Sequence, residues 1–203
     1  MIEIWGHKDA PNVRKVLWAA AELRRPLHRI DAGGRFGGVD EAAYRAMNPN
    51  GRVPTIRDGD FVLWESHAIM RYLAETTRDQ ALIPATPQAR ARMNQWMDWQ
   101  LAHQAGAIRA LVMLTLKTDT APDAARLSAA RRDADALFAM LDDALSRHGF
   151  IAGDGFTLAD IAIAIGYERW SRLPIERPAF PHLANWFVRA CARPGYRDLP
   201  VAA

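Results

Sequence analysis

The chain has 203 residues, 50% of them hydrophobic and 24% charged, which is an ordinary globular composition and enough for one large or two small cores. Its net charge of +3 comes from scattered arginines, and no apolar run approaches the ~20 residues that span a bilayer, so we expect neither a nucleic-acid nor a membrane partner. The single cysteine, Cys191, excludes an internal disulfide and a CxxC site, which indicates a reducing compartment, the cytoplasm.

The first elements in chain order form a strand–helix–strand pattern. Residues 2–5 alternate apolar and polar side chains, which predicts a short strand. Pro11 suits the first turn of a helix, and apolar residues recur at helical spacing over 13–23 before Pro26 ends the run. A second strand over 27–31 would complete a βαβ unit with a right-handed crossover.

A loop, a hairpin and another helix are predicted next. Residues 33–38 are rich in glycine and show no apolar period, so they are predicted to form an exposed loop. Strand signals over 53–57 and 61–64 flank Asp58-Gly59-Asp60, which predicts an antiparallel hairpin. Ser66 is predicted to be the N-cap of the helix that follows.

The rest of the chain predicts helices. Residues 79–87 contain prolines and no apolar period, and they are predicted to form an interdomain linker. The Ala-rich segments 88–117 and 123–147 favour long helices that pack as a bundle. Residues 157–160 have the form of a capping box, and a last helix is predicted over 182–193.

Five strings in the chain carry a family resemblance: NVRKVLWAAAEL (12–23), NPNGRVPTI (48–56), DGDFVLWESHAIMRYLAE (58–75), FTLADIAIA (156–164) and ARPGY (192–196). In this order and spacing they resemble the cytosolic glutathione S-transferases, in particular bacterial theta-, nu- and beta-like members. The resemblance implies an α/β domain followed by an all-α domain. These are a thioredoxin-like βαβ-ββα domain over 1–78, the linker over 79–87 and a helical domain over 88–203.

The resemblance also implies a function. It indicates a glutathione transferase that acts in detoxification and binds glutathione as its substrate. The enzyme would promote attack of the glutathione thiolate on a hydrophobic electrophilic small molecule, or it would catalyse a glutathione-dependent peroxide or disulfide reaction. A homodimer is predicted from the apolar stripe of Met93, Trp96 and Met97, which would be a large exposed patch on a monomer. The alternative is a non-catalytic glutathione-binding or protein-interaction module on the same fold.

Four residues match the family positions that hold the γ-glutamyl and cysteinyl parts of glutathione. Val53-Pro54 resembles the family's cis-proline turn, which would aim the Val53 backbone at the cysteinyl part of the tripeptide. The alternative for Pro54 is an ordinary edge-strand proline. Ser66 and the N–H groups of its helix could bind the γ-glutamyl carboxylate, and the family places a residue such as Glu65 beside it to orient the same group.

Two arginines are candidates for binding the glycyl carboxylate of glutathione. A guanidinium matches a carboxylate with two parallel hydrogen bonds. Arg52 lies at the family's basic position before Val53-Pro54 and is preferred. Arg35 comes from the Gly-rich loop, and a binding role and a solvated surface position are equally compatible with its sequence context.

The position where serine-type relatives bind the glutathione sulfur is Ala10, which offers no hydroxyl. The usual serine mechanism and a cysteine-based deglutathionylation mechanism are therefore both in question. Asn12 is the preferred catalytic residue because its amide could donate to sulfur, with a role at the helix start as the alternative. The helix N-terminus can itself stabilise a thiolate, and Lys8 and His7 are further candidates.

A second-substrate pocket is expected between the two domains. It would be lined by aromatic or adaptable side chains, although such residues often serve as core instead. No metal site is expected, because no second His or Cys lies at helical spacing from His103. The candidates are Lys8, Trp99, His103, Met113 and Tyr167, with Trp96 beside them.

Overall fold

The computed structural model describes residues 1–78, 82–117 and 123–199. The chain divides into two compact units, one formed by Met1–Ile83 together with Ala192–Ala203 and the other by Pro84–Cys191. The predicted combination of an α/β domain and a helical domain is confirmed. Within the described parts, no helix combines the length and apolarity that crossing a bilayer requires.

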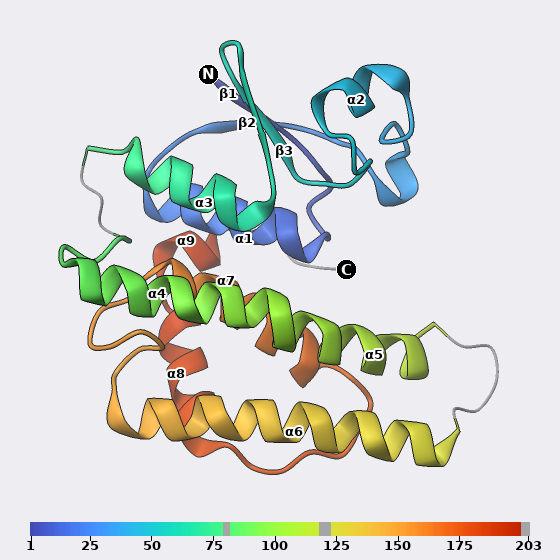
Figure 1. Ribbon diagram of the computed structural model, residues 1–203, viewed down its shortest axis with the longest axis vertical. Coiled ribbons are helices and arrows are strands. Elements are labelled where there is room, and N and C mark those ends of the chain that lie inside the picture. The colour runs from blue at the N-terminus through green and yellow to red at the C-terminus, as the bar shows by residue number, and fades with distance from the viewer. Residues whose placement is uncertain (79–81, 118–122, 200–203) are drawn as a thin grey trace. The chain divides into compact units, whose positions relative to one another are not determined.

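A four-stranded sheet forms the frame of the first unit (Figure 1). Its strands are β1 (Ile2–Trp5), β2 (Leu27–Ile30), β3 (Thr55–Asp58) and β4 (Phe61–Trp64), in the order β2-β1-β3-β4. The β1–β2 pair is parallel, whereas β3 runs antiparallel to both β1 and β4. The predicted βαβ unit and hairpin are therefore both present, with the hairpin shifted by two residues at its first strand.

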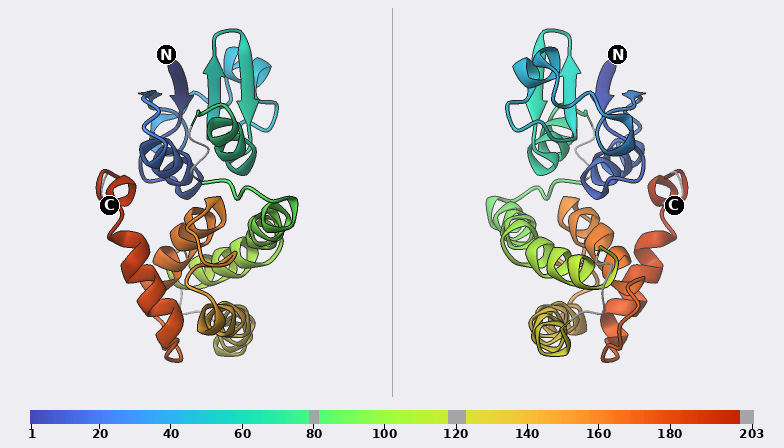
Figure 2. Two further views of the ribbon diagram at one scale, coloured as in Figure 1. Left: turned by 90° about the vertical axis from the view of Figure 1, so that its left-hand side faces the viewer. Right: turned by 90° about the vertical axis from the view of Figure 1, so that its right-hand side faces the viewer.

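Helices α1 (Pro11–Glu22) and α3 (Ser66–Glu75) pack against each other beside the sheet (Figure 1, Figure 2). Their apolar faces and the central strands form one core, in which Ile4, Ile56 and Ile69 are fully buried. Two short elements escaped prediction because they have too few residues to show a period: the 3-10 turn η1 (Gly34–Phe36) and α2 (Ala42–Met47).

The C-terminal segment belongs to the first unit and not to the helical domain predicted over 88–203. Instead of simply stopping the preceding helix, Pro194 starts a short helix, α9 (Pro194–Arg197), which contacts α1. The rings of Trp18 and Tyr196 meet edge to face at 4.9 Å, and Arg193 forms a 2.7 Å ion pair with the buried carboxylate of Glu22. These long-range contacts have no local sequence signal, so the sequence alone does not associate this segment with the first unit.

The second unit is a helical bundle around α7, which is buried along almost its whole length. A π-helical turn divides the predicted helix over 88–117, a local widening that the apolar period does not reveal. The capping box at Thr157 is confirmed. The helices are α4 (Pro87–Trp99), α5 (Ala105–Thr115), α6 (Ala124–Arg147), α7 (Leu158–Ser171) and α8 (Pro181–Cys191), with the π-helical turn η2 (Gln100–Gln104) between α4 and α5.

Candidate active site

A small cavity of about 60 Å³ lies in the first unit where four segments meet. The segments are the start of α1, the loop after α2, the turn before β3 and the start of α3. The structure thus brings together the predicted residues Asn12, Arg52, Val53-Pro54, Glu65 and Ser66, although they are spread over more than fifty positions of sequence. It adds two residues for which no role was predicted, Asn48 and Asn50.

The turn before β3 forms one wall of the cavity. Its Val53–Pro54 peptide bond is cis, as predicted. The Arg52 side chain is exposed, whereas Pro54 is buried. The backbone carbonyl of Arg52 accepts hydrogen bonds from the Tyr44 hydroxyl at 2.7 Å and from the Asn48 amide at 2.8 Å. This wall is therefore held from behind by side chains of α2 and its following loop.

The start of α3 forms the opposite wall and has an unusual backbone. Glu65, and not Ser66 as predicted, is the N-cap, with a φ of 72° that residues with a side chain rarely adopt. The Glu65 side chain makes no capping bond. Ser66 is the first helical residue and is 1% exposed, yet its hydroxyl has no hydrogen-bond partner among the described residues. A strained N-cap next to a buried unpaired hydroxyl makes this helix start a candidate binding element.

The start of α1 contributes Asn12 to the cavity. Ala10 is the N-cap and gives no side-chain bond, so the helix begins without a capping side chain. Asn12 is the second helical residue and is exposed. The alternative role of Asn12 as an N-cap is therefore wrong, while its place in the first turn is as predicted.

A buried basic residue lies one turn along α1 from Asn12. Lys15 is 2% exposed, and its Nζ lies 3.4 Å from Nε2 of the buried His67 on α3. Burial lowers the pKa of Lys15 to about 7, and the nearby Glu65 carboxylate acts in the opposite direction. No local sequence pattern predicts this contact, although the i, i+3 spacing puts Asn12 and Lys15 on one face of the helix.

Comparison with known proteins decides the family. The chain matches the family descriptions "Glutathione S-transferase, N-terminal domain" over residues 10–76 and "Glutathione S-transferase, C-terminal domain" over residues 105–194. It is 38% identical to "Glutathione S-transferase GstB" of Escherichia coli strain K12 over 202 residues, which cover 98% of this chain and 97% of the relative. The chain belongs to the glutathione S-transferase family. The predicted family, fold and enzyme class are thereby confirmed.

More distant and structural relatives agree with this assignment. "Glutathione S-transferase 3" of Zea mays is 30% identical over 99% of this chain and 94% of its own length. Among solved structures, the theta class glutathione S-transferase of Xanthomonas axonopodis pv. citri with glutathione bound is 42% identical, with a TM-score of 0.92 over 100% of this chain and 99% of that chain.

The second arginine predicted for this transferase, Arg35, does not line the cavity. It lies in η1, exposed, with its guanidinium 4.9 Å from the ring centroid of Phe36. The Phe36 ring in turn lies 6.2 Å from His7, on the loop after β1. These contacts place Arg35 in a small surface cluster on the Gly-rich loop and favour Arg52 as the guanidinium of the cavity.

The residues predicted for a second-substrate pocket occupy both units. Lys8 is half-buried on the loop after β1, and Met113 is 52% exposed on α5. Trp99 and His103 are ring neighbours at 6.1 Å on α4 and η2, with Trp96 stacked edge to face on Trp99. Tyr167 packs edge to face against Phe138 and Phe187 of the helical unit. Among the residues that the structure describes, no group of three His, Cys, Asp or Glu side chains could hold a metal ion.

Proposed function

We propose that this transferase binds glutathione in the cavity of its first unit and promotes attack of the glutathione thiolate on a hydrophobic electrophilic small molecule. The observation that carries the assignment of the site is the buried Ser66 hydroxyl, which has no partner in the described chain. A buried polar group in that state is costly unless a ligand completes its hydrogen bonds.

The γ-glutamyl part of glutathione suits the start of α3. Its α-carboxylate can accept hydrogen bonds from the Ser66 hydroxyl and from the first free N–H groups of the helix, where the helix dipole favours negative charge. Its ammonium can pair with the exposed carboxylate of Glu65, which is adjacent in sequence to Ser66. The γ-glutamyl group, which carries both a carboxylate and an ammonium, is thus matched by the hydrogen-bond donors at Ser66 and the neighbouring carboxylate of Glu65.

The rest of the tripeptide suits the wall formed by the turn before β3. The backbone N–H and C=O of Val53 can pair with the cysteinyl residue in the manner of an added strand. The exposed guanidinium of Arg52 is available for the glycyl carboxylate. This direction of binding brings the cysteinyl sulfur toward the start of α1.

The start of α1 would favour the thiolate. Ala10 cannot donate a hydrogen bond, so the donors are the Asn12 carboxamide and the free N–H groups of the first turn of α1. Hydrogen bonds to the anionic sulfur lower the thiol pKa and raise the fraction of nucleophile at neutral pH. Asn12 then acts as the catalytic residue.

Ala10 also favours a second candidate function, a non-catalytic glutathione-binding or interaction module. The two candidates share the binding site and differ in turnover. Measurable conjugation by the parent protein that falls in Asn12→Ala supports the enzyme. Tight glutathione binding without turnover for any electrophile supports the module.

A homodimer in the cytoplasm is proposed, but not on the predicted stripe. Met93 and Met97 are 2% and 0% exposed, so they form no patch on a monomer. The edge strand β4 gives better support, since its Phe61 and Trp64 are 47% and 37% exposed. Light scattering tests this proposal: twice the 22.7 kDa chain mass is expected, and a mass near 22.7 kDa at micromolar concentration contradicts it.

The site is tested by calorimetry with the double variant Glu65→Ala/Ser66→Ala. Each charge-assisted hydrogen bond lost should cost about 1.5–3 kcal/mol, so binding should weaken by more than about tenfold. Glu41→Ala is the matched control, because Glu41 is also an exposed N-cap glutamate without a side-chain capping bond. Equal affinities of the double variant and the control would refute the assignment.

A further inference from the structure

A buried polar network lies behind the Arg52–Pro54 wall of the cavity. The Tyr44 hydroxyl donates to the Arg52 carbonyl at 2.7 Å and lies 2.9 Å from the Thr55 hydroxyl. Asn48 donates from Nδ2 to the same Arg52 carbonyl at 2.8 Å and to Thr55 Oγ1 at 3.0 Å. Since the one proton of Tyr44 goes to Arg52, the Thr55 hydroxyl is left to donate to the Tyr44 oxygen.

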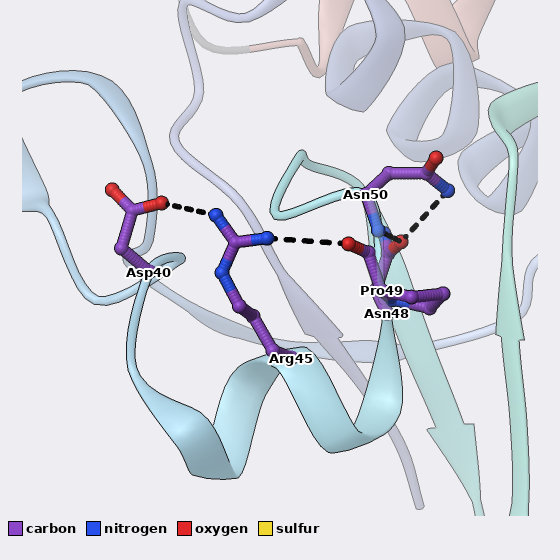
Figure 3. Close-up of polar contacts among 5 residues, drawn as sticks. All are labelled: Asp40, Arg45, Asn48, Pro49 and Asn50. Atoms are coloured by element: carbon purple, nitrogen blue, oxygen red, sulfur yellow. Dashed lines mark hydrogen bonds and ion pairs between the residues drawn. The ribbon is translucent and has the colours of Figure 1, made fainter.

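Asn48 is the centre of this network and uses its full hydrogen-bonding capacity. Besides its two donated bonds, its Oδ1 accepts from the backbone N and from Nδ2 of Asn50, both at 3.1 Å (Figure 3). A carboxamide offers two donors and two acceptor positions, and all four are occupied. An ionised aspartate could not donate hydrogen bonds to Arg52 and Thr55, and an aliphatic side chain could neither donate these bonds nor accept those from Asn50. Asparagine is therefore specified by the contacts at this position.

The network is buried, and a second set of contacts connects its outer side to α2. Tyr44, Asn48 and Thr55 are 5%, 3% and 0% exposed, so a broken bond would leave a desolvated polar group. Figure 3 shows Arg45 of α2 reaching from Asp40 to the carbonyl of Pro49, at 2.7 and 3.3 Å.

Gly51 completes the loop on this outer side. It has a φ of 60°, and a Cβ there would lie 3.1 Å from both the Arg45 guanidinium and the Val39 carbonyl. A residue with a side chain would therefore be strained in its backbone and crowded by its neighbours.

We propose that Tyr44 and Asn48 are positioning residues for glutathione, an inference that rests on the proposed function. By holding the Arg52 carbonyl they fix the Val53 backbone and the Arg52 side chain against the tripeptide, and Asn48 also sets the Asn50 carboxamide on the cavity wall. Within the described residues, the hydrogen bonds of this network join Tyr44 and Asn48 to Arg52, Asn50 and Thr55. They govern the affinity for glutathione and leave the activation of its thiol unchanged.

Tyr44→Phe tests the inference, with Tyr72→Phe as the matched control. Both tyrosines donate one hydrogen bond within the first unit, and Tyr72 donates to Asp58 at 2.9 Å on the β3–β4 hairpin, outside the cavity lining. In Tyr44→Phe the dissociation constant and KM for glutathione should rise about five- to tenfold, as for one lost hydrogen bond, while kcat at saturating glutathione stays within about twofold. Tyr72→Phe should keep all three values within about twofold of the parent.

A purely structural role predicts a different pattern. It would lower the thermal midpoint of both variants and leave the glutathione affinity of the folded protein alone, which would overturn the inference. If Tyr44→Phe does not fold, Asn48→Ala removes the other donor to the Arg52 carbonyl, and a folded Asn48→Ala protein with parental affinity would also overturn the inference. Loss of the fold in both variants would show that the network serves stability and contradict the proposal.

The same titrations separate this inference from the proposed function. A parent protein that fails to bind glutathione contradicts the proposed function and the inference together. A parent that binds, with Tyr44→Phe equal to Tyr72→Phe, contradicts the inference alone.

Discussion

Two helix starts of this chain solve the same problem in opposite ways. At α7, Asp160 accepts hydrogen bonds from the Thr157 backbone and hydroxyl, from the Ile151 backbone and from the Trp186 indole. At α3, Glu65 gives no side-chain cap, and the buried Ser66 hydroxyl is unpaired within the described residues. The first helix start is complete within its own unit, whereas the second has donors left for a ligand. A closed helix start stabilises the fold, whereas an open one leaves polar groups whose hydrogen bonds a ligand can complete.

The largest loss of stability is expected when the hydrogen bonds at the closed start of α7 are removed. In Asp160→Ala the four donors around this fully buried carboxylate lose their acceptor, which should cost at least about 3 kcal/mol of unfolding free energy. Urea denaturation followed by tryptophan fluorescence measures the loss. The closed character of α7 would be contradicted by a change below about 1 kcal/mol.

Lys15→Met should change how the stability of the protein depends on pH, because Lys15 is buried against His67 near the open start of α3. The pKa of Lys15 is about 7 in the folded protein and 10.5 in an exposed lysine, so above pH 7 the unfolded chain binds the extra proton. The stability of the parent should therefore rise relative to Lys15→Met by about 2 kcal/mol between pH 7 and pH 9. The penalty of charged Lys15 is fully present below pH 7.

Urea titrations at the two pH values measure this difference. Lys117→Met is the control, because it is the same substitution at an exposed lysine. A stability difference between the parent and Lys15→Met that is constant with pH would show that Lys15 does not change its charge in this range.

Ser66→Ala and Thr157→Ala should have inverse effects. Ser66→Ala removes an unpaired buried hydroxyl, so stability should stay the same or rise, while glutathione binding weakens about tenfold. Thr157→Ala removes a capping bond to the Ala159 N–H and should cost about 1 kcal/mol of stability, with affinity unchanged. Thermal unfolding measures the stability of both variants, and calorimetry measures their affinity for glutathione. Equal changes in stability and in affinity for the two variants would contradict the contrast between the two helix starts.

The smallest effect is expected at the start of α1. Asn12→Ala should raise the pKa of the bound glutathione thiol by about one unit, because a donor to the anionic sulfur is lost. Thiolate absorbance against pH measures the shift. Ala10→Ser should lower the same pKa if position 10 faces the sulfur. An unchanged pKa in Asn12→Ala would leave the backbone N–H groups of α1 or Lys8 as the source of activation.

The sequence predicted those features that depend on local pattern. The βαβ unit, the hairpin and the cap at Thr157 follow from apolar periods and turn residues within a few positions. The motif strings also brought Arg52, Val53 and Glu65 forward, and the structure places them around one cavity.

What could not be predicted depends on contacts between distant segments. Lys15 and His67 are in contact although they are 52 positions apart in sequence. Helix α9 contacts α1 although all the residues of the helical unit come between them in sequence. The hydrogen bonds that specify Asn48 come from the fold of the loop, which an Asn-Pro pair alone does not reveal. The unpaired state of Ser66 is likewise visible only once its surroundings are folded.

The central claim is that the open start of α3 is completed by glutathione, and a crystal structure of the complex tests it most directly. The account predicts that the γ-glutamyl carboxylate accepts a hydrogen bond from the Ser66 hydroxyl at about 2.7 Å, with its ammonium on Glu65 and the cysteinyl backbone paired to Val53. Glutathione bound elsewhere, or bound here with the Ser66 hydroxyl still unpaired, would contradict the account.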